Sequence, residues 1–394
     1  MKSPAGRHGA LAPLALFCAL TLTACDGRAQ IGASRGDRGA LLELPALSDS
    51  AWGALVLSLS EEGGYFDTDN LISNERSYLH VLAPLRRMAG GAYVGVGPDQ
   101  SFSYLAAARP AVAFLIDVRR DNLLHHLLLR SLFLLSSNRA EYLARLHGRA
   151  LPEGTRAWDD RTLEAILDRV DSLPADPAAV RATRRAVAAL LRALPLPLSD
   201  ADLATIERFH QEFVSQGTGL RFRTFGRAPQ PYYPNYRQLL LETDARGRQG
   251  SFLVSEEDFR WLKDLQARNL VVPVVGDLAG SHAMRAVAGW LTEHGVGVSE
   301  YYTSNVEDYL WRGGDYPAFV ANVRALPWTS DGVIIRSYFG GRRGSFPGLA
   351  ALPGYYSIQL LQPATAFLRA ADSLMDGTRM SYEQVITAGL IDLR

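Results

Sequence analysis

Glycines and single carboxylates at the ends of apolar runs are the residues of this sequence that could do chemistry. Gly95 and Gly97 lie at the end of one short apolar run, and a second run, 111–116, ends on Asp117. Glycine lets a turn bring the backbone close to a ligand, because it carries no Cβ. Asp117 follows Gly95 by 22 positions, near the roughly 20 that separate a nucleotide-binding glycine turn from its ribose-binding acid. This spacing predicts a small-molecule site.

Two other interpretations of the glycine turn stay open. A glycine after a strand also lets the strand and the following helix pack closely, and a Gly-x-Gly pair alone fits that role. A nicotinamide dinucleotide is another possible ligand of Gly95, Gly97 and Asp117. Asp99, at the next alternate position, departs from the Gly-x-Gly-x-x-Gly pattern of such sites.

The elements that would position these residues follow an α/β pattern. Apolar runs typical of buried parallel strands occur at 93–96, 111–116, 270–275, 298–302 and 332–338, with a last strand over 355–361. Helical patterns fall between most of them, so we expect a Rossmann-like, mostly parallel sheet.

A long helical stretch interrupts this alternation after the second strand. Helical patterns occur at 122–147, 158–172, 176–194 and 199–216, and a β-hairpin is predicted from 239–243 and 251–254. The sequence therefore predicts three parts after residue 46. They are the first part of the α/β domain (47–147), a mainly helical insertion with a β-hairpin (148–268), and the second part of the α/β domain (269–394).

The polar segment 61–75 precedes the first strand. Ser73 could cap a helix that begins near Arg76, or the segment could fold over the mouth of the site. Its Asp-x-Asp-Asn run does not fit a calcium loop of the EF-hand type, because the sixth position is Ile72 and not glycine. We expect no metal site.

The first 24 residues are typical of a signal peptide. Lys2 and Arg7 form a basic start before the apolar segment 11–22, which is short for a membrane span. It runs into Leu-Thr-Ala-Cys25, which resembles a bacterial lipoprotein signal. The resemblance implies that Cys25 is lipidated and that the protein is held on a membrane of the cell envelope, facing the periplasm or the exterior. Residues 25–46 are then a small, polar, glycine-rich tether.

Charge and motifs exclude several functions. The chain has 41 basic and 41 acidic residues, which argues against nucleic-acid binding driven by net charge. It has no Gly-x-Ser-x-Gly elbow, no His-Glu-x-x-His pair and no Walker-type lysine. Its only other cysteine, Cys18, falls in the predicted signal peptide.

Taken together, the strands and their terminal acids resemble a class I S-adenosylmethionine-dependent methyltransferase domain. Acids close the first turn (Asp99), the second strand (Asp117) and the third strand (Asp277). More narrowly, the runs at 63–70, 95–100 and 116–122 resemble a family of uncharacterised bacterial lipoproteins with methyltransferase-like folds. The resemblance covers roughly 60–125 and 269–375.

The resemblance implies roles for individual residues. Gly95 and Gly97 would face the methionine part of S-adenosylmethionine, Asp117 would hold its ribose hydroxyls, and Asp277 its adenine amino group. Substrate or catalytic residues would fall at three positions around the fourth strand, namely Tyr301, Ser304 and Asn305. Two positions differ from the usual turn, since Tyr93 stands where an acid is usual and Asp99 where a third glycine is usual.

Two hypotheses of function remain. In the first, the protein is a lipid-anchored envelope protein whose domain binds a nucleotide-like or other small ligand without catalysis. In the second, it is an active methyltransferase of unknown acceptor. S-Adenosylmethionine is a charged cytoplasmic metabolite, which favours the first hypothesis for a protein outside the cytoplasm.

Overall fold

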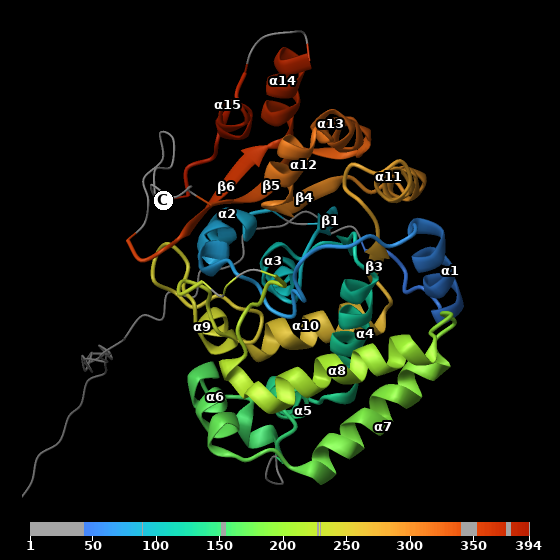
Figure 1. Ribbon diagram of the computed structural model, residues 1–394, viewed down its shortest axis with the longest axis vertical. Coiled ribbons are helices and arrows are strands. Elements are labelled where there is room, and N and C mark those ends of the chain that lie inside the picture. Colours follow the sequence, from blue (N-terminus) through green and yellow to red (C-terminus); the bar gives the residue numbers. More distant parts are fainter. Residues whose placement is uncertain are drawn as a thin grey trace, which may run out of the picture. The chain divides into compact units, whose positions relative to one another are not determined.

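The computed structural model describes residues 43–88, 90–150, 155–226, 228, 230–339, 353–375 and 380–393 (Figure 1). These residues all belong to one compact unit. Cys25, the predicted signal peptide and most of the predicted tether lie outside them. No helix within the described ranges is long and apolar enough to cross a membrane.

One mostly parallel sheet organises the described part of the chain. Its strands are β1 (Ala92–Gly95), β2 (Val112–Asp117), β3 (Val271–Val275), β4 (Val298–Ser304), β5 (Trp328–Phe339) and β6 (Ser357–Pro363). They lie in the order β3-β2-β1-β4-β5-β6, and only β6 runs antiparallel to its neighbour. This is the Rossmann strand order with the last strand reversed, so the predicted α/β class is confirmed.

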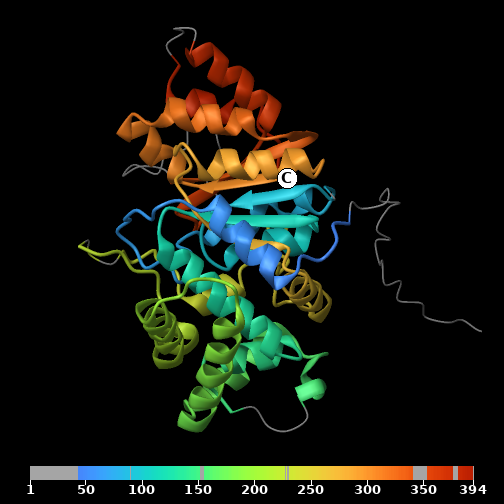
Figure 2. The same cartoon turned by 90° about the vertical axis from the view of Figure 1, so that its right-hand side faces the viewer.

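Helices cover both faces of the sheet (Figure 2). One layer is formed by α11 (Ala283–Glu293), α13 (Tyr316–Ala325) and α14 (Ala364–Met375), and the other by α3 (Gln100–Ala108), α4 (Arg120–Leu135) and α10 (Glu256–Ala267). Strands covered in this way bury both sides, which is why their sequences are continuous apolar runs and do not alternate. The remaining elements outside the β2–β3 connection are α1 (Asp49–Leu59), η1 (Arg76–Val81), α2 (Leu82–Leu85), α12 (Val306–Gly313) and α15 (Tyr382–Thr387).

The connection from β2 to β3 contains, within its described residues, helices joined by loops and no named strand. After α4 come α5 (Arg139–Leu146), η2 (Thr155–Trp158), α6 (Leu163–Ser172), α7 (Pro177–Ala193), α8 (Asp200–Gln216), η3 (Gly217–Gly219), α9 (Tyr236–Leu240) and α10. The predicted helix 122–147 is two helices, because Asn138 accepts a hydrogen bond from the Glu141 N–H and starts α5.

The predicted β-hairpin in this connection is wrong. The first two residues of the first expected strand (239–243) are the end of α9, whose capping box joins Asn235 and Gln238 through reciprocal side-chain to backbone hydrogen bonds. Residues 251–254 form turns, and pairing is limited to one isolated bridge between Thr243 and Gln249. The capping box directs the leucines of this segment onto the buried face of a short helix, so they are not available to pair as a strand.

A buried ion pair lies where α12 meets β5. Arg336 on β5 donates from Nε to Glu307 Oε1 at 2.6 Å, and their side chains are 2% and 0% exposed. Glu307 also accepts hydrogen bonds from the hydroxyls of Thr303 and Tyr316. Arg336 reaches Gln362 on β6 through Nη1, so this pair connects β4, β5, β6 and α12.

We expect Arg336→Met to lower the free energy of unfolding by about 3–5 kcal/mol, because it leaves the Glu307 carboxylate buried without a cation. Denaturant unfolding monitored by circular dichroism measures this change. The matched control is Arg312→Met, which removes the exposed pair with Asp308 (Arg312 side chain 72% exposed) and should cost less than about 0.5 kcal/mol. Equal losses in the two variants would contradict a central role for the buried pair.

Candidate ligand-binding site

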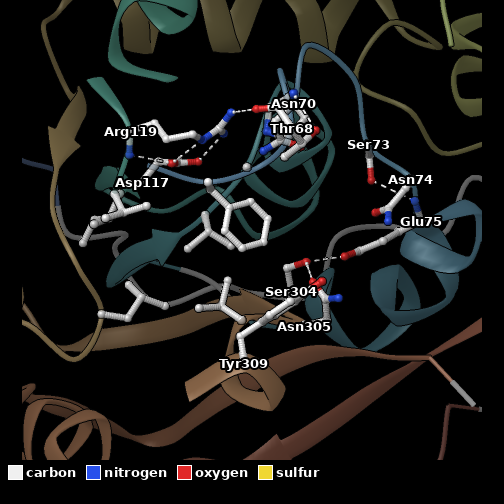
Figure 3. Close-up of a pocket in the computed structure, with 18 of the residues that line it drawn as sticks. Thr68, Asn70, Ser73, Asn74, Glu75, Asp117, Arg119, Ser304, Asn305 and Tyr309 are labelled. Carbon is white, nitrogen blue, oxygen red and sulfur yellow. Dashed lines mark hydrogen bonds and ion pairs between the residues drawn. The ribbon is translucent and has the colours of Figure 1, made fainter. Parts of the chain in front are cut away.

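A cavity of about 310 Å³ opens at the carboxyl edge of the parallel strands (Figure 3). The turns after β1, β2, β3 and β4 form its floor. Segment 65–75 closes one side, and Phe222, Thr224 and Tyr233 close another. This edge, where the strand order reverses beside β1, is the usual place for a ligand in an open α/β sheet. The residues that line it are Tyr65, Phe66, Thr68, Asn70, Ser73, Asn74, Glu75, Val96, Gly97, Pro98, Gln100, Ile116, Asp117, Val118, Arg119, Phe222, Thr224, Tyr233, Gly276, Asp277, Leu278, Tyr302, Ser304, Asn305, Val306, Tyr309 and Leu310.

The two glycines of the turn have different roles. Gly97 lines the cavity with φ +89°, and no atom lies within 4 Å of a Cβ placed there, so it supplies the left-handed backbone of the turn. Its carbonyl oxygen accepts from Asn122 Nδ2 at 3.2 Å and lies 3.0 Å from His126 Nε2. Gly95 does not line the cavity, because the ring of Tyr93 occupies the space where its Cβ would lie. The structure therefore shows a packing role for Gly95, and its predicted contact with a ligand stays a prediction.

Asp99 also points away from the cavity. Its side chain is buried (4% exposed), and Oδ2 accepts a hydrogen bond of 2.5 Å from the Tyr236 hydroxyl on α9. Burial raises the pKa of this carboxyl to about 7. The prediction of Asp99 as a ligand-binding residue is wrong, since the first turn of α3 directs the side chain toward α9.

Asp117 lines the cavity at the end of β2, where it forms a bidentate pair with Arg119 (Figure 3). Oδ1 accepts from the backbone N–H of Arg119 at 2.9 Å and from its Nε at 3.0 Å, and Oδ2 accepts from Nη2 at 2.8 Å. Arg119 Nη1 donates to the Thr68 carbonyl at 2.5 Å. Arg119 therefore connects the end of β2 to the polar segment 61–75.

Asp277 lines the cavity after β3. Its Oδ1 accepts from the Ala279 N–H at 2.8 Å, and its own N–H donates to Glu61 Oε1 at 2.7 Å. Segment 61–75 thus contacts the turns after both β2 and β3, in agreement with the interpretation that it closes over the site. Ser73 accepts a hydrogen bond from the Glu75 N–H. The N-cap of η1 is Glu75, without a side-chain cap hydrogen bond, so the prediction that Ser73 caps this helix is wrong.

On β4, the tyrosine that reaches the cavity is Tyr302 and not Tyr301. Tyr301 is fully buried on the opposite side of the strand, where its ring lies 6.3 Å from that of Phe319. Successive side chains of a strand point to opposite faces of the sheet, which accounts for the difference. The prediction of Tyr301 as a site residue is wrong, whereas Ser304 and Asn305 do line the cavity.

Glu75, which is not among the residues predicted from the sequence, lies at the inner wall of the cavity (Figure 3). Its buried carboxylate accepts hydrogen bonds from five side chains on four elements. They are Tyr302 Oη at 2.5 Å, Gln100 Nε2 at 3.2 Å, Gln359 Nε2 at 3.4 Å, and the hydroxyls of Ser304 and Ser337. No local pattern around Glu75 indicates these partners, because all five are distant in the sequence.

Charge in the cavity lining is unbalanced. Three carboxylates, Glu75, Asp117 and Asp277, face one guanidinium, that of Arg119. The described residues contain no group of three or more His, Cys, Asp or Glu side chains arranged to hold a metal ion. The lining therefore suits a ligand that is cationic or rich in hydrogen-bond donors.

The fold and the cavity define an α/β protein with a cavity at the carboxyl edge of its sheet. The chain belongs to a family described as Domain of unknown function (DUF7790), whose match covers residues 71–385. No curated protein is significantly similar to it. The match begins just before Glu75 and includes all of the sheet.

We expect Asp99→Asn to flatten the pH dependence of stability. The folded pKa of about 7 lies above the unfolded value of about 3.9. Between these pH values the folded protein holds a proton that the unfolded chain has lost, so stability declines as the pH rises from about 4 to about 7. Asparagine cannot ionise and still accepts from Tyr236, so the variant should lose this part of the decline, which is at most about 4 kcal/mol.

Thermal or urea unfolding at several pH values measures the effect. Burial also raises the pKa of Glu300, to about 8, so some decline in the same direction should remain in the variant. Asp264→Asn, at an exposed position of α10, is the control and should leave the profile unchanged. Parallel profiles for the wild type and Asp99→Asn would show that Asp99 ionises normally.

Proposed function

We propose that the cavity binds a nucleoside-like ligand that carries positive charge and no phosphate, and S-adenosylmethionine serves as the probe of that chemistry. The observation that carries this proposal is the lining itself, in which three carboxylates face one guanidinium at the carboxyl edge of a Rossmann-like sheet. The sulfonium and ammonium groups of such a ligand complement these carboxylates. The cavity volume of about 310 Å³ lies at the lower end of the range of small-molecule sites.

Binding of a dinucleotide is disfavoured at the start of α3. In Rossmann folds the pyrophosphate lies against the N-terminus of the first helix, where free N–H groups and the helix dipole attract anions. Here Pro98 has no N–H, and Asp99 buries a carboxyl group at the N-cap of α3. A second carboxyl, that of Glu75, lies close by through its hydrogen bond to Gln100 in the first turn of α3.

Asp117 is the residue best placed to accept a ribose hydroxyl. A carboxylate offers about four lone-pair sites, and Arg119 occupies three of those of Asp117. One site remains, on Oδ2, so Asp117 can accept one hydroxyl while its pair with Arg119 stays intact. Arg119 holds this carboxylate in a single orientation before the ligand arrives.

We expect S-adenosylmethionine to stabilise the protein by roughly 2.7 kcal/mol at a concentration of about 100 times its dissociation constant. A thermal melting curve measures this gain. Asp117→Asn should remove most of it, because hydrogen bonds to a charged group contribute about 1.5–3 kcal/mol. The gain is compared within each variant, so any change in basal stability cancels.

Asp121→Asn, four residues further on and outside the cavity lining, is the matched control and should keep the full gain. ATP has the same nucleoside but carries phosphates, and it should give no shift. A shift with ATP and none with S-adenosylmethionine would reverse the charge argument and refute the proposal.

We further propose that Cys25 carries a lipid that anchors the protein to a membrane of the cell envelope, with 148–268 as a helical insertion in the anchored domain. The support is the basic start, the apolar segment and the Leu-Thr-Ala-Cys25 run of the sequence. In this arrangement the domain meets its ligand outside the cytoplasm and acts as a binding module.

Cys25→Ser should release the protein from the membrane fraction or block its processing, since it removes the sulfur that would carry the lipid. Fractionation and electrophoretic mobility measure the two outcomes. Cys18→Ser is the control, because that cysteine falls in the segment predicted to be removed. Unchanged fractionation and mobility of Cys25→Ser would contradict lipidation.

A second candidate function is methyl transfer to an acceptor. The feature that favours it is Ser304, a non-glycine residue with φ +53° at the end of β4. This conformation is uncommon and is found at functional sites that the surrounding structure holds in place. The hydrogen bond from the Ser304 hydroxyl to Glu75 provides that constraint at the cavity wall. Release of S-adenosylhomocysteine in the presence of an acceptor distinguishes methyl transfer from binding alone.

A further inference from the structure

A second cavity, of about 150 Å³, adjoins the first. Asn74 and Tyr233 line both cavities, so they form the wall between them. The side-chain amide of Asn74 forms no hydrogen bond with any residue that the structure describes. An amide with free donors and acceptors in a shared wall can contact a ligand on either side.

The second cavity differs from the first in charge. Two guanidinium groups, those of Arg76 and Arg221, line it, and no carboxylate does. Arg76 is paired with Glu242 at 2.9 Å outside the lining. Arg221 donates from Nη1 to the Tyr233 carbonyl at 2.9 Å and forms no ion pair within the described ranges. Its positive charge is therefore available to an anion.

Aromatic rings form one side of the same cavity. Tyr232 and Tyr356 stack with their centroids 3.5 Å apart and their planes at 12°, and Tyr356 remains 42% exposed. Stacked rings with an exposed face can pack against another planar group. A cavity of about 150 Å³ is large enough for a benzene ring.

We propose that this second cavity binds an anionic group on a planar or aromatic body, as a second ligand beside the one in the first cavity. Arg221 pairs with the anion, the tyrosine stack packs against the planar body, and Asn74 lies between the two ligands. The inference extends the proposed function, because it makes the site one for two ligands of opposite charge. It rests on residues that the first ligand does not need, apart from Asn74 and Tyr233.

Binding of benzoate and of phenyl phosphate to the full chain tests the proposal by calorimetric titration. Both probes should bind, whereas benzyl alcohol, which has no charge, and inorganic phosphate, which has no ring, should bind at least about tenfold more weakly. Arg221→Gln should weaken benzoate binding by about tenfold or more, because it removes a charged hydrogen-bond donor. Tyr356→Leu removes the exposed ring without altering Arg221 and should also weaken binding.

Arg181→Gln, at an exposed position of α7 outside both cavities, is the matched control and should bind benzoate as the wild type does. No binding of benzoate or phenyl phosphate would overturn the proposal, and so would binding that neither Arg221→Gln nor Tyr356→Leu weakens. The titrations are repeated with S-adenosylmethionine present. If benzoate binds but S-adenosylmethionine does not, the second cavity stands and the proposed nucleoside site falls. If S-adenosylmethionine binds but benzoate does not, the nucleoside site stands and the second-cavity proposal falls.

Discussion

The buried carboxylate of Glu75 is the constraint on which the arrangement of the site depends. A carboxylate removed from water must be compensated by hydrogen bonds or a cation, since an uncompensated one is very costly to bury. Glu75 has no guanidinium or ammonium partner among the described residues, and it receives hydroxyl and amide donors from α3, β4, β5 and β6. These donors can compensate the buried carboxylate only if all four elements keep their positions relative to one another.

This requirement has a direct effect on the cavity wall. Tyr302 and Ser304, which face the cavity, have their hydroxyl groups oriented by Glu75. Gln100 donates to both Glu75 and the Tyr302 hydroxyl, so the start of α3 belongs to the same network. The polar groups of this wall are therefore held in fixed orientations before a ligand binds, which lowers the entropic cost of binding.

The segment that supplies Glu75 is held at two further points. Its Thr68 carbonyl accepts from Arg119, and its Glu61 carboxylate accepts from the turn after β3. Segment 61–75 therefore closes one side of the cavity through hydrogen bonds to three of the strand ends. The large acidic cavity and the small basic one lie on either side of Asn74, at the end of the same segment. Because the two neighbouring cavities carry charges of opposite sign, they favour two ligands of different charge over a single ligand that fills both.

The sequence by itself determined the α/β class, the positions of the strands and the location of Gly97, Asp117, Asp277, Ser304 and Asn305 at the edge where the cavity lies. These features are local, because an apolar run makes a buried strand and the residue after it must lie at the strand's carboxyl end. The roles of these residues toward a ligand stay predictions. Helix caps are equally local. The capping box that begins at Asn235 is visible in the sequence, and it predicts α9 at the place where the first strand of the hairpin was expected.

Only the tertiary structure decided which side chains face the cavity. Tyr302 reaches it and Tyr301 does not, because the face of β4 that meets the cavity is set by the pairing and packing of the sheet. Asp99 turns to Tyr236, which lies 137 positions away in the chain. Glu75 gains its role from donors on four separate elements. Local sequence sets the hydrophobic periodicity of each element and the residues where it ends. The partners of a buried polar group depend on contacts between elements, which no local pattern encodes.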